Sequence, residues 1–216
     1  MIISPGRKLI FVHIPKTGGT SLALALEARA MKDDILIGDT PKARRRRRRL
    51  RHASARGRLW KHSTLADIEG LVSREFIRSC FCVTLVRNPW DRLVSLYEWL
   101  KLQSFEHPMV ARAQAQDFGG FLRAPATLGA LRAAPYGAYL RDGAGVEHPA
   151  HFIRLEHFAE DAAPLWAHLG FRLDLPHENR SPRGADHRAY YDTALADLVA
   201  QLCAEDIARF GYSFEG

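Results

Sequence analysis

The amino-acid sequence predicts an α/β fold in which a central parallel sheet is flanked by helices. Residues 9–12 form a short apolar run inside a predicted strand at 7–13, and a glycine-containing loop and the alanine- and leucine-rich segment 20–30 follow it directly. Residues 80–86 form a second apolar run, and residues 90–102 behind it carry apolar side chains at helical spacing. Strands that alternate with helices in this way build a parallel sheet with helices on both faces.

The remaining elements follow in a regular order along the chain. Strands are expected at residues 7–13, 80–86 and 151–155. Helices are expected at residues 20–30, 90–102, 105–123, 161–169 and 192–210, with Gly211 as the last stop signal. Irregular structure is expected at residues 124–149 and 176–184, and a variable, basic and mobile insertion at residues 31–58.

Size and composition favour a single domain over residues 1–216. With 216 residues and 47% hydrophobic content, the chain can bury one substantial core. It has neither the run of about 20 apolar residues that a membrane span needs nor the features of a secretory signal. Its three cysteines do not make a disulfide framework, and Cys80 and Cys82 are expected on one face of a buried strand. Free thiols without a signal predict a cytoplasmic location.

The net charge of +7 is concentrated in one segment, because residues 44–49 are six consecutive arginines. Three interpretations stay open: a solvated basic surface, a contact surface for an anionic partner, or an arm that binds nucleic acid. Nucleic acid is disfavoured, since no aromatic residue that could stack on bases occurs in this stretch before Trp60.

The loop between the first strand and the first helix has the composition of an anion site. Glycines let backbone N–H groups approach an anion closely, and the start of a helix adds unpaired donors and a favourable dipole. One lysine adds a positive charge, and three hydroxyl side chains add donors. The residues concerned are Pro15, Lys16, Thr17, Gly18, Gly19, Thr20 and Ser21. The alternative is a plain turn in which Thr20 or Ser21 only caps the helix.

The order of residues in this loop separates two kinds of nucleotide site. A Walker loop places its lysine after the second glycine, whereas Lys16 precedes both Gly18 and Gly19. An ordinary ATP or GTP site is therefore disfavoured. The segment instead resembles the 5′-phosphosulfate loop of the sulfotransferases that use 3′-phosphoadenosine 5′-phosphosulfate (PAPS). That resemblance implies a P-loop-like, three-layer fold.

A second phosphate motif follows the strand at 80–86. Arg87 stands at the strand end, where its guanidinium can fork onto a phosphate, and Ser95 lies two turns into the next helix. The alternative is that Arg87 and Arg92 are only ion-pair partners of Asp91. Residues 87–97 resemble the 3′-phosphate motif R-N-P-x-x-R-x-x-S-x-Y of the same family without a mismatch. The resemblance implies that Arg87 and Ser95 bind the 3′-phosphate of PAPS.

Weaker similarity extends over most of the chain. Residues 177–183 are similar to the H-x-N-[KR]-S segment of carbohydrate-type and small bacterial sulfotransferases, which implies that Arg183 contacts the nucleotide. Residues 152–158 and 207–212 are similar to a later strand and to the terminal helix of that subgroup. The acceptor implied is the hydroxyl group of a saccharide or glycolipid.

The chemistry needs a base for the acceptor proton and a cation for the leaving phosphate. Lys16 can serve as the cation. His62 is the preferred base, because imidazole titrates near neutrality and residues 61–64 resemble the K-H-[AS]-T stretch of bacterial carbohydrate-type members. The alternative for His62 is an ordinary surface histidine. No metal is expected, since the ten histidines are not spaced for zinc.

Two other functions stay open at this point. One is an ATP-dependent small-molecule kinase, against which the position of Lys16 argues. The other is a non-enzymatic module that binds an anionic partner or nucleic acid through residues 44–49. Neither the acceptor nor the oligomeric state follows from the sequence.

Overall fold

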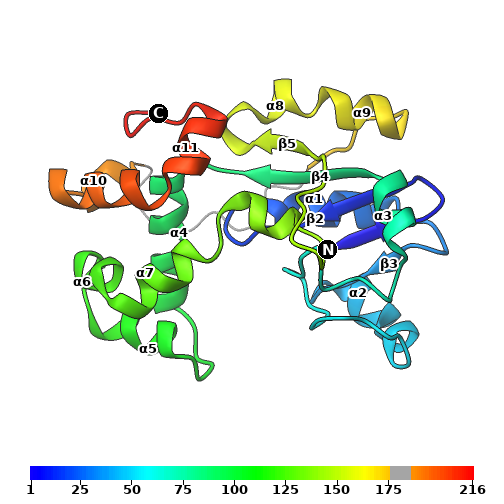
Figure 1. Ribbon diagram of the computed structural model, residues 1–216, viewed down its shortest axis with the longest axis horizontal. Helices are drawn as coiled ribbons and strands as arrows, with labels where there is room; N and C mark the ends of the chain where they lie inside the picture. The colour runs from blue at the N-terminus through cyan, green and yellow to red at the C-terminus, as the bar shows by residue number, and fades with distance from the viewer. Residues whose placement is uncertain (176–185) are drawn as a thin grey trace. The chain divides into compact units, whose positions relative to one another are not determined.

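The computed structural model describes residues 1–175 and 186–216 and contains one five-stranded sheet with the order β3-β1-β2-β4-β5 (Figure 1). The strands are β1 Ile2–Ser4, β2 Leu9–Val12, β3 Ile35–Leu36, β4 Phe81–Val86 and β5 His151–Arg154. Strands β2, β4 and β5 are parallel, which confirms the prediction for the half of the sheet that carries the loops of interest.

The prediction of a purely parallel sheet is wrong for β1, which runs antiparallel to both β2 and β3. Only residues 5–8 connect β1 to β2. A connection this short can only reverse the chain into a hairpin, because a parallel crossover needs a dozen or more residues. Residues 1–4 were not predicted as a strand at all.

The described residues fall into two compact units. Unit 1 comprises residues 1–86 and 136–175 and holds the whole sheet. Its helices are α1 Gly19–Ala28, α2 Pro41–Arg46, η1 Arg47–Leu50, α3 Arg74–Ser79, η2 Tyr136–Leu140, η3 Leu155–His157, α8 Phe158–Asp161 and α9 Ala163–Leu169. The single-domain expectation stays a prediction.

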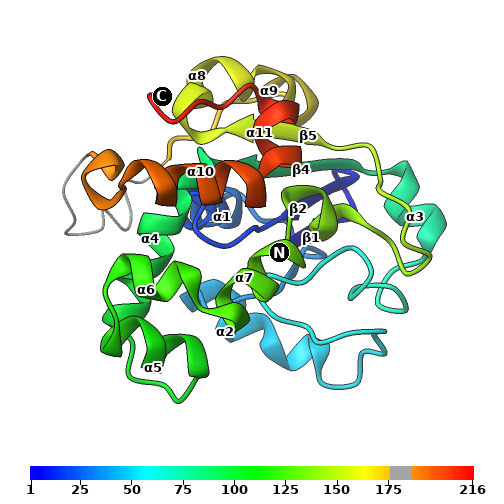
Figure 2. The same ribbon diagram turned by 60° about the vertical axis from the view of Figure 1, so that its left-hand side comes forward.

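Unit 2 comprises residues 87–135 and 186–216 and is entirely helical in its regular structure. Its helices are α4 Pro89–Lys101, α5 Pro108–Ala115, α6 Phe118–Arg123, α7 Pro125–Arg132, η4 His187–Tyr190, α10 Thr193–Leu202 and α11 Ala204–Phe210. Helix α4 presents its predicted apolar stripe to α5, α6 and α10, and Leu93, Tyr97 and Leu100 are buried there (Figure 2).

Both faces of the sheet in unit 1 are covered, as the sequence predicts. Alternate residues of β2 and β4 point to opposite faces. Phe11 and Leu85 pack with α1 and α9 on one face. Ile10 and Cys82 pack on the other face with the buried Ile77 of α3. Burial on both sides explains why these strands are continuous apolar runs rather than alternating ones.

Several helix boundaries differ from the prediction, for local reasons. The segment 105–123 is two helices, because the Asp117 side chain accepts a hydrogen bond from Gly120 N and so caps α6 anew. Residues 192–210 also form two helices, which meet at Cys203. Gly211 ends the second one at φ 68°, as expected. Residues 124–149, expected to be irregular, contain α7 and η2.

The segment 31–58 is partly regular. Thr40 caps α2 by accepting a hydrogen bond from Ala43 N, Pro41 occupies the first turn, and the arginine run continues through α2 into η1. The three cysteines are free thiols, and Cys82 is buried in its strand as expected. In residues 1–175 and 186–216, no helix has the length and apolar character required to cross a membrane.

Candidate functional site

The loop after β2 holds its lysine in an unusual backbone conformation. Lys16 has φ 66°, a left-handed value that few residues other than glycine adopt, and Gly18 has φ 82°. The Thr17 hydroxyl is fully buried and donates to Ile14 O at 2.9 Å, which fixes the turn between them. Strained backbone of this kind persists where the surrounding structure enforces it, and it concentrates at functional sites.

At both glycines a side chain would collide with a neighbouring residue. A Cβ atom on Gly18 would lie 2.7 Å from Leu155 Cδ1. A Cβ atom on Gly19 would lie 2.3 Å from His13 Cδ2. The backbone of the first turn of α1 therefore runs against two side chains, and only glycine fits at these positions.

The structure argues against the capping alternative for the loop hydroxyls. Gly18 is the N-cap of α1, and no side chain makes a cap hydrogen bond there. Thr20 and Ser21 are half-buried, and their hydroxyls make no hydrogen bond to the described residues. The first turn thus has backbone and hydroxyl donors at the positive end of a helix, an arrangement that suits an anion.

His62 lies directly beside this loop, although it is 49 residues from His13 in sequence. Its Nδ1 lies 2.7 Å from the carbonyl oxygen of His13, and the two imidazole rings meet edge to face at 4.7 Å. Since a carbonyl only accepts, Nδ1 carries the proton and Nε2 carries the lone pair. His62 is therefore not an ordinary surface histidine.

Burial is the main cause that lowers the pKa of His62 to about 4, and the nearby Lys61 ammonium contributes to this lowering. Burial also lowers the pKa of His13 well below its usual value. Both rings are consequently neutral at physiological pH. A neutral His62 is able to accept a proton, which is the state that a general base requires.

The second predicted motif lies in unit 2 and begins at the residue after β4. Arg87 Nε donates to Asp91 Oδ2 at 2.6 Å, and both side chains are mostly buried. The alternative interpretation expected an ion pair with Asp91, and the structure contains it with Arg87 as the partner. Asn88 caps α4 by accepting from Trp90 N at 3.1 Å. Ser95 is 3% exposed, within α4.

The predicted site residues thus divide between the units. The structure brings His62, His13 and Gly19 together with the Lys16 loop in unit 1. Arg87 and Ser95 belong to unit 2. Strands β2 and β4 are parallel neighbours, with Val12 opposite Thr84, so both loops leave from the carboxyl edge of the sheet, where open α/β sheets bind ligands. Arg183 lies outside the described residues.

Three neighbours of these residues escaped the sequence analysis as site residues: Leu155, Asp91 and Trp60. Leu155 gave no signal of its own, since it matters only through its contact with Gly18. Asp91 entered the sequence analysis only as the ion-pair partner of Arg87 and Arg92, and not as part of the site. Trp60 is 43% exposed, and its ring meets the His62 ring edge to face at 5.0 Å. The separation of two residues between Trp60 and His62 was the only available signal.

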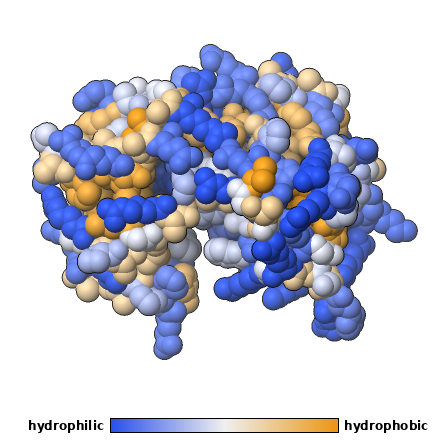
Figure 3. Space-filling view, viewed as in Figure 1, coloured by the Kyte–Doolittle hydropathy of each residue, from blue (hydrophilic) through white to orange (hydrophobic). Residues whose placement is uncertain are grey.

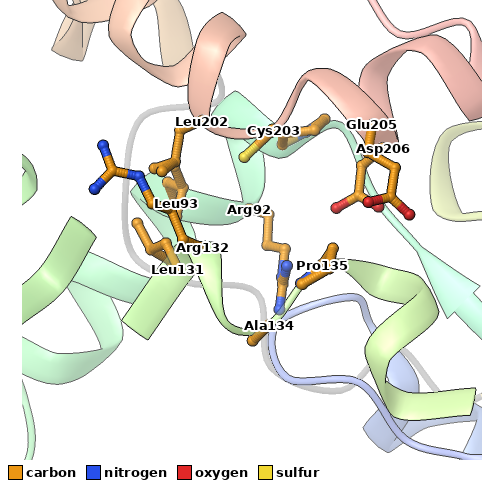
Figure 4. Close-up of a pocket in the computed structure, with 11 residues that line it drawn as sticks. Arg92, Leu93, Leu131, Arg132, Ala134, Pro135, Leu202, Cys203, Glu205 and Asp206 are labelled. Carbon is orange, nitrogen blue, oxygen red and sulfur yellow. The ribbon is translucent and has the colours of Figure 1, made fainter. Parts of the chain in front are cut away.

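Unit 2 also contains a small pocket of about 110 Å³ (Figure 4). It is bounded by α4, α7, α10 and α11, and it combines Arg92 and Arg132 with the carboxylates of Glu205 and Asp206. Burial raises the pKa of the lining thiol Cys203 to about 11, so this thiol is protonated and unreactive. A volume of this size accommodates a few water molecules. Pro89, Arg92 and Leu93 of the 87–97 motif line the pocket, whereas Arg87 and Ser95 are not among its lining residues.

The chain is thus an α/β protein in which a strained glycine loop opens a helix at the carboxyl edge of parallel strands, an arrangement that suits an anion. An arginine follows at the end of the next strand. The family model described as the sulfotransferase family matches residues 1–212, and the chain belongs to this family. It is accordingly a transferase of sulfuryl groups. Searches of curated proteins and of solved structures found no match. Within residues 1–175 and 186–216, no group of three histidine, cysteine or acidic side chains is arranged to hold a metal ion.

Proposed function

We propose that this protein transfers the sulfuryl group of PAPS to a hydroxyl group of a saccharide or glycolipid. The observation that carries the proposal is the loop at residues 15–21, with a lysine held at φ 66° ahead of two sterically required glycines. A Walker loop has its lysine after the glycines, so this loop does not fit the ATP-dependent kinase alternative.

The donor has two separate anionic groups, and the chain has two motifs to bind them. In this proposal the backbone donors of Gly18 and Gly19, with Lys16 and the hydroxyls of Thr20 and Ser21, hold the 5′-phosphosulfate. The Thr17 hydroxyl, named with them from the sequence, instead holds the turn, because it is buried and donates to Ile14 O. Arg87 and Ser95 hold the 3′-phosphate, and Arg183 contacts the nucleotide. The order of the strands supports the assignment of both motifs to one donor. The Lys16 loop follows β2, and Arg87 directly follows β4, the parallel neighbour of β2.

The reaction forms one bond and breaks one. The acceptor oxygen bonds to the sulfur atom, while the bond from sulfur to the bridging phosphate oxygen breaks and leaves its electron pair on adenosine 3′,5′-bisphosphate. Lys16 stabilises the charge that develops on that oxygen. The acceptor proton passes to Nε2 of His62, the ring nitrogen that carries the lone pair.

A binding experiment tests the donor assignment. Isothermal calorimetry should give tight binding of adenosine 3′,5′-bisphosphate, and Lys16→Ala and Arg87→Ala should each weaken it by about tenfold to a hundredfold, the loss expected for one charge-assisted hydrogen bond. Lys8→Ala is the matched control, since Lys8 is also a lysine with a left-handed backbone, at φ 47°, but lies in the β1–β2 turn. Binding of ATP in preference to the bisphosphate would refute the proposal.

A further inference from the structure

His62, the proposed base, lies in a segment without a helix or a strand. Residues 51–73, between η1 and α3, consist of turns, bends and one isolated bridge. Figure 3 shows mostly hydrophilic atoms around α2, the helix that comes just before this segment in the chain. No apolar side chain of residues 57–64 is fully buried. The position of His62 therefore depends on hydrogen bonds more than on packing.

Asp67 closes the part of this segment that contains His62. Its Oδ2 accepts hydrogen bonds from Thr64 N at 2.7 Å and from Thr64 Oγ1 at 3.0 Å, and its own N donates to Thr64 Oγ1 at 3.2 Å. Its carbonyl oxygen accepts from Gly57 N at 3.1 Å. One residue thus joins both ends of the loop 57–67, and its side chain holds Thr64, two residues after the proposed base.

The two ends of this loop lie in direct contact. A Cβ atom on Gly57 would lie 1.9 Å from Asp67 Oδ1 and 2.9 Å from Asp67 Cα. The Cα atom belongs to the backbone, so it cannot turn aside as the end of a flexible side chain can. Only glycine allows an approach this close, and the loop is closed at that point.

The residues on either side of Asp67 are fastened to the rest of unit 1. Leu65 and Ile68 are fully buried. Glu69 is 8% exposed, and it accepts hydrogen bonds from Gly143 N at 2.7 Å and from two nitrogen atoms of Arg74 at 3.0 Å each. Asp67 is consequently a fixed point, and the bonds that it makes to Thr64 pass its position on to His62.

We propose that Asp67 is a positioning residue, which holds His62 in the orientation required of a general base. The inference rests on the proposed function and adds a residue to its machinery. His62 has its lone pair on Nε2 only while Nδ1 donates to His13 O, at 2.7 Å. A base must lie within hydrogen-bond reach of the proton that it removes, and a displacement of about 1 Å costs about a hundredfold in rate.

Ser63 has a more limited role inside the same loop. Its hydroxyl lies 2.9 Å from the carbonyl oxygens of both Arg58 and Trp60, so it holds the turn that carries the Trp60 ring. Its removal leaves the closure between Gly57 and Asp67 in place. Loss of the Asp67 side chain, in contrast, releases the chain that follows His62.

The first measurement is the tautomer of His62 in the full chain. Long-range ¹H–¹⁵N spectra of protein with labelled histidine report which ring nitrogen carries the proton, and His62→Gln identifies the signals among those of ten histidines. The parent protein should show a proton on Nδ1. Asp67→Ala should shift His62 toward the Nε2–H tautomer that a free side chain prefers. Asp67→Asn should keep the parent tautomer, because its amide oxygen still accepts from Thr64 N.

The second measurement is transfer from labelled PAPS to a panel of cellotetraose, chitotetraose and a uronic acid tetrasaccharide. Asp67→Ala should lower kcat by about tenfold to a hundredfold. The KM for PAPS and the affinity for adenosine 3′,5′-bisphosphate should not change, since Asp67 makes no contact with the Lys16 loop. Asp67→Asn should restore most of kcat. In a His62→Gln background, Asp67→Ala should lower kcat no further, because the two residues act as one unit.

Asp117→Ala is the matched control. Asp117 also accepts a hydrogen bond from a backbone nitrogen three residues away, Gly120 N at 2.7 Å, but it belongs to unit 2. This variant should change neither the His62 tautomer nor kcat. Thr64→Val is a milder second variant for the case that Asp67→Ala does not fold. It removes both contacts of the Thr64 hydroxyl and should shift the tautomer and kcat in the same direction.

The outcomes separate this inference from the proposed function. If Asp67→Ala, or Thr64→Val in its place, keeps the parent tautomer, or if Asp67→Ala lowers kcat equally with and without His62, Asp67 is only structural and the inference is wrong. The donor assignment would then still stand. If the parent protein does not bind the bisphosphate, the proposed function fails, whereas a tautomer shift in Asp67→Ala would still show that Asp67 positions the His62 ring.

Discussion

Replacing Gly19 by alanine tests the packing that shapes the donor loop. The new Cβ atom would lie 2.3 Å from Cδ2 of His13, whereas carbon atoms pack at about 3.5–4.0 Å. The ring has no room to move away, because His13 is 6% exposed and lies between Phe11 at 5.7 Å and His62 at 4.7 Å. The first turn of α1 must therefore shift.

Overpacking of this kind costs about 1–3 kcal/mol, and the higher helix propensity of alanine returns at most about 1 kcal/mol. We expect Gly19→Ala to destabilise the protein by about 1–2 kcal/mol, a fall in Tm of roughly 2–8 °C for a chain of this size. It should also weaken binding of adenosine 3′,5′-bisphosphate, because the loop that carries Lys16 moves with the helix.

Gly129 provides the matched control for this change. It lies inside α7, and a Cβ atom on it would have no neighbour within 4 Å. Gly129→Ala should therefore raise Tm slightly, through propensity alone. Thermal unfolding followed by circular dichroism measures both variants. If Gly19→Ala were stabilising like Gly129→Ala, or if adding His13→Ala did not relieve its cost, the contact between His13 and α1 would not exist as described.

Three further predictions concern the base, the second motif and the turn at Trp60. Burial lowers the pKa of His62 to about 4, so kcat/KM should stay constant as the pH falls through 6.5 and decline only near 4–5; a decline centred at 6.5 would contradict the burial of this base. As the pH falls, His62 takes up a proton in the unfolded chain near pH 6.5 and in the folded protein only near pH 4, so the free energy of unfolding should decrease between these values. His62→Gln should reduce this dependence of the unfolding free energy on pH, measured by urea titrations at several pH values. Asp91→Asn removes the carboxylate that holds the Arg87 guanidinium in place, so it should weaken binding of adenosine 3′,5′-bisphosphate about tenfold. Binding of adenosine 5′-monophosphate, which has no 3′-phosphate, should not change. Tighter binding of the bisphosphate would show instead that Asp91 only competes with the phosphate for Arg87. The Ser63 hydroxyl holds the turn at Trp60 through the carbonyl oxygens of Arg58 and Trp60, so Ser63→Ala should raise the KM for the acceptor without altering kcat or bisphosphate binding. An equal loss of bisphosphate affinity in calorimetry would mean that this turn also supports the Lys16 loop.

Elements defined by local pattern were predicted well. The apolar runs that became β2, β4 and β5 were correct to within a few residues, as were α1 and α4, because periodicity and glycine position are properties of neighbouring residues. The errors concern elements that depend on more distant partners. Strand β1 is three residues long and has no pattern of its own, and it exists because β2 and β3 pair with it on both sides.

The candidate site also combines features that local sequence predicts with features that depend on distant residues. The Lys16 loop and the Arg87 motif are contiguous in sequence, so their residue types and order were readable directly. His62 was preferred from a resemblance and an unperturbed pKa. The neutral state that the structure indicates comes from burial against His13. Six identical letters do not show that Arg46 donates hydrogen bonds to Met31 O and Asp34 O and that Arg49 donates one to Lys32 O.

By itself the sequence determined the family, the α/β class, and the lysine placed ahead of two glycines, since each depends on residues that adjoin in the chain. Only the tertiary structure decided why those glycines cannot be replaced, which tautomer His62 adopts and which arginines hydrogen-bond to the preceding loop. The reason is physical. Leu155 meets Gly18, and His62 meets His13, only after the sheet has brought distant segments to the same edge, and no local pattern encodes such a contact.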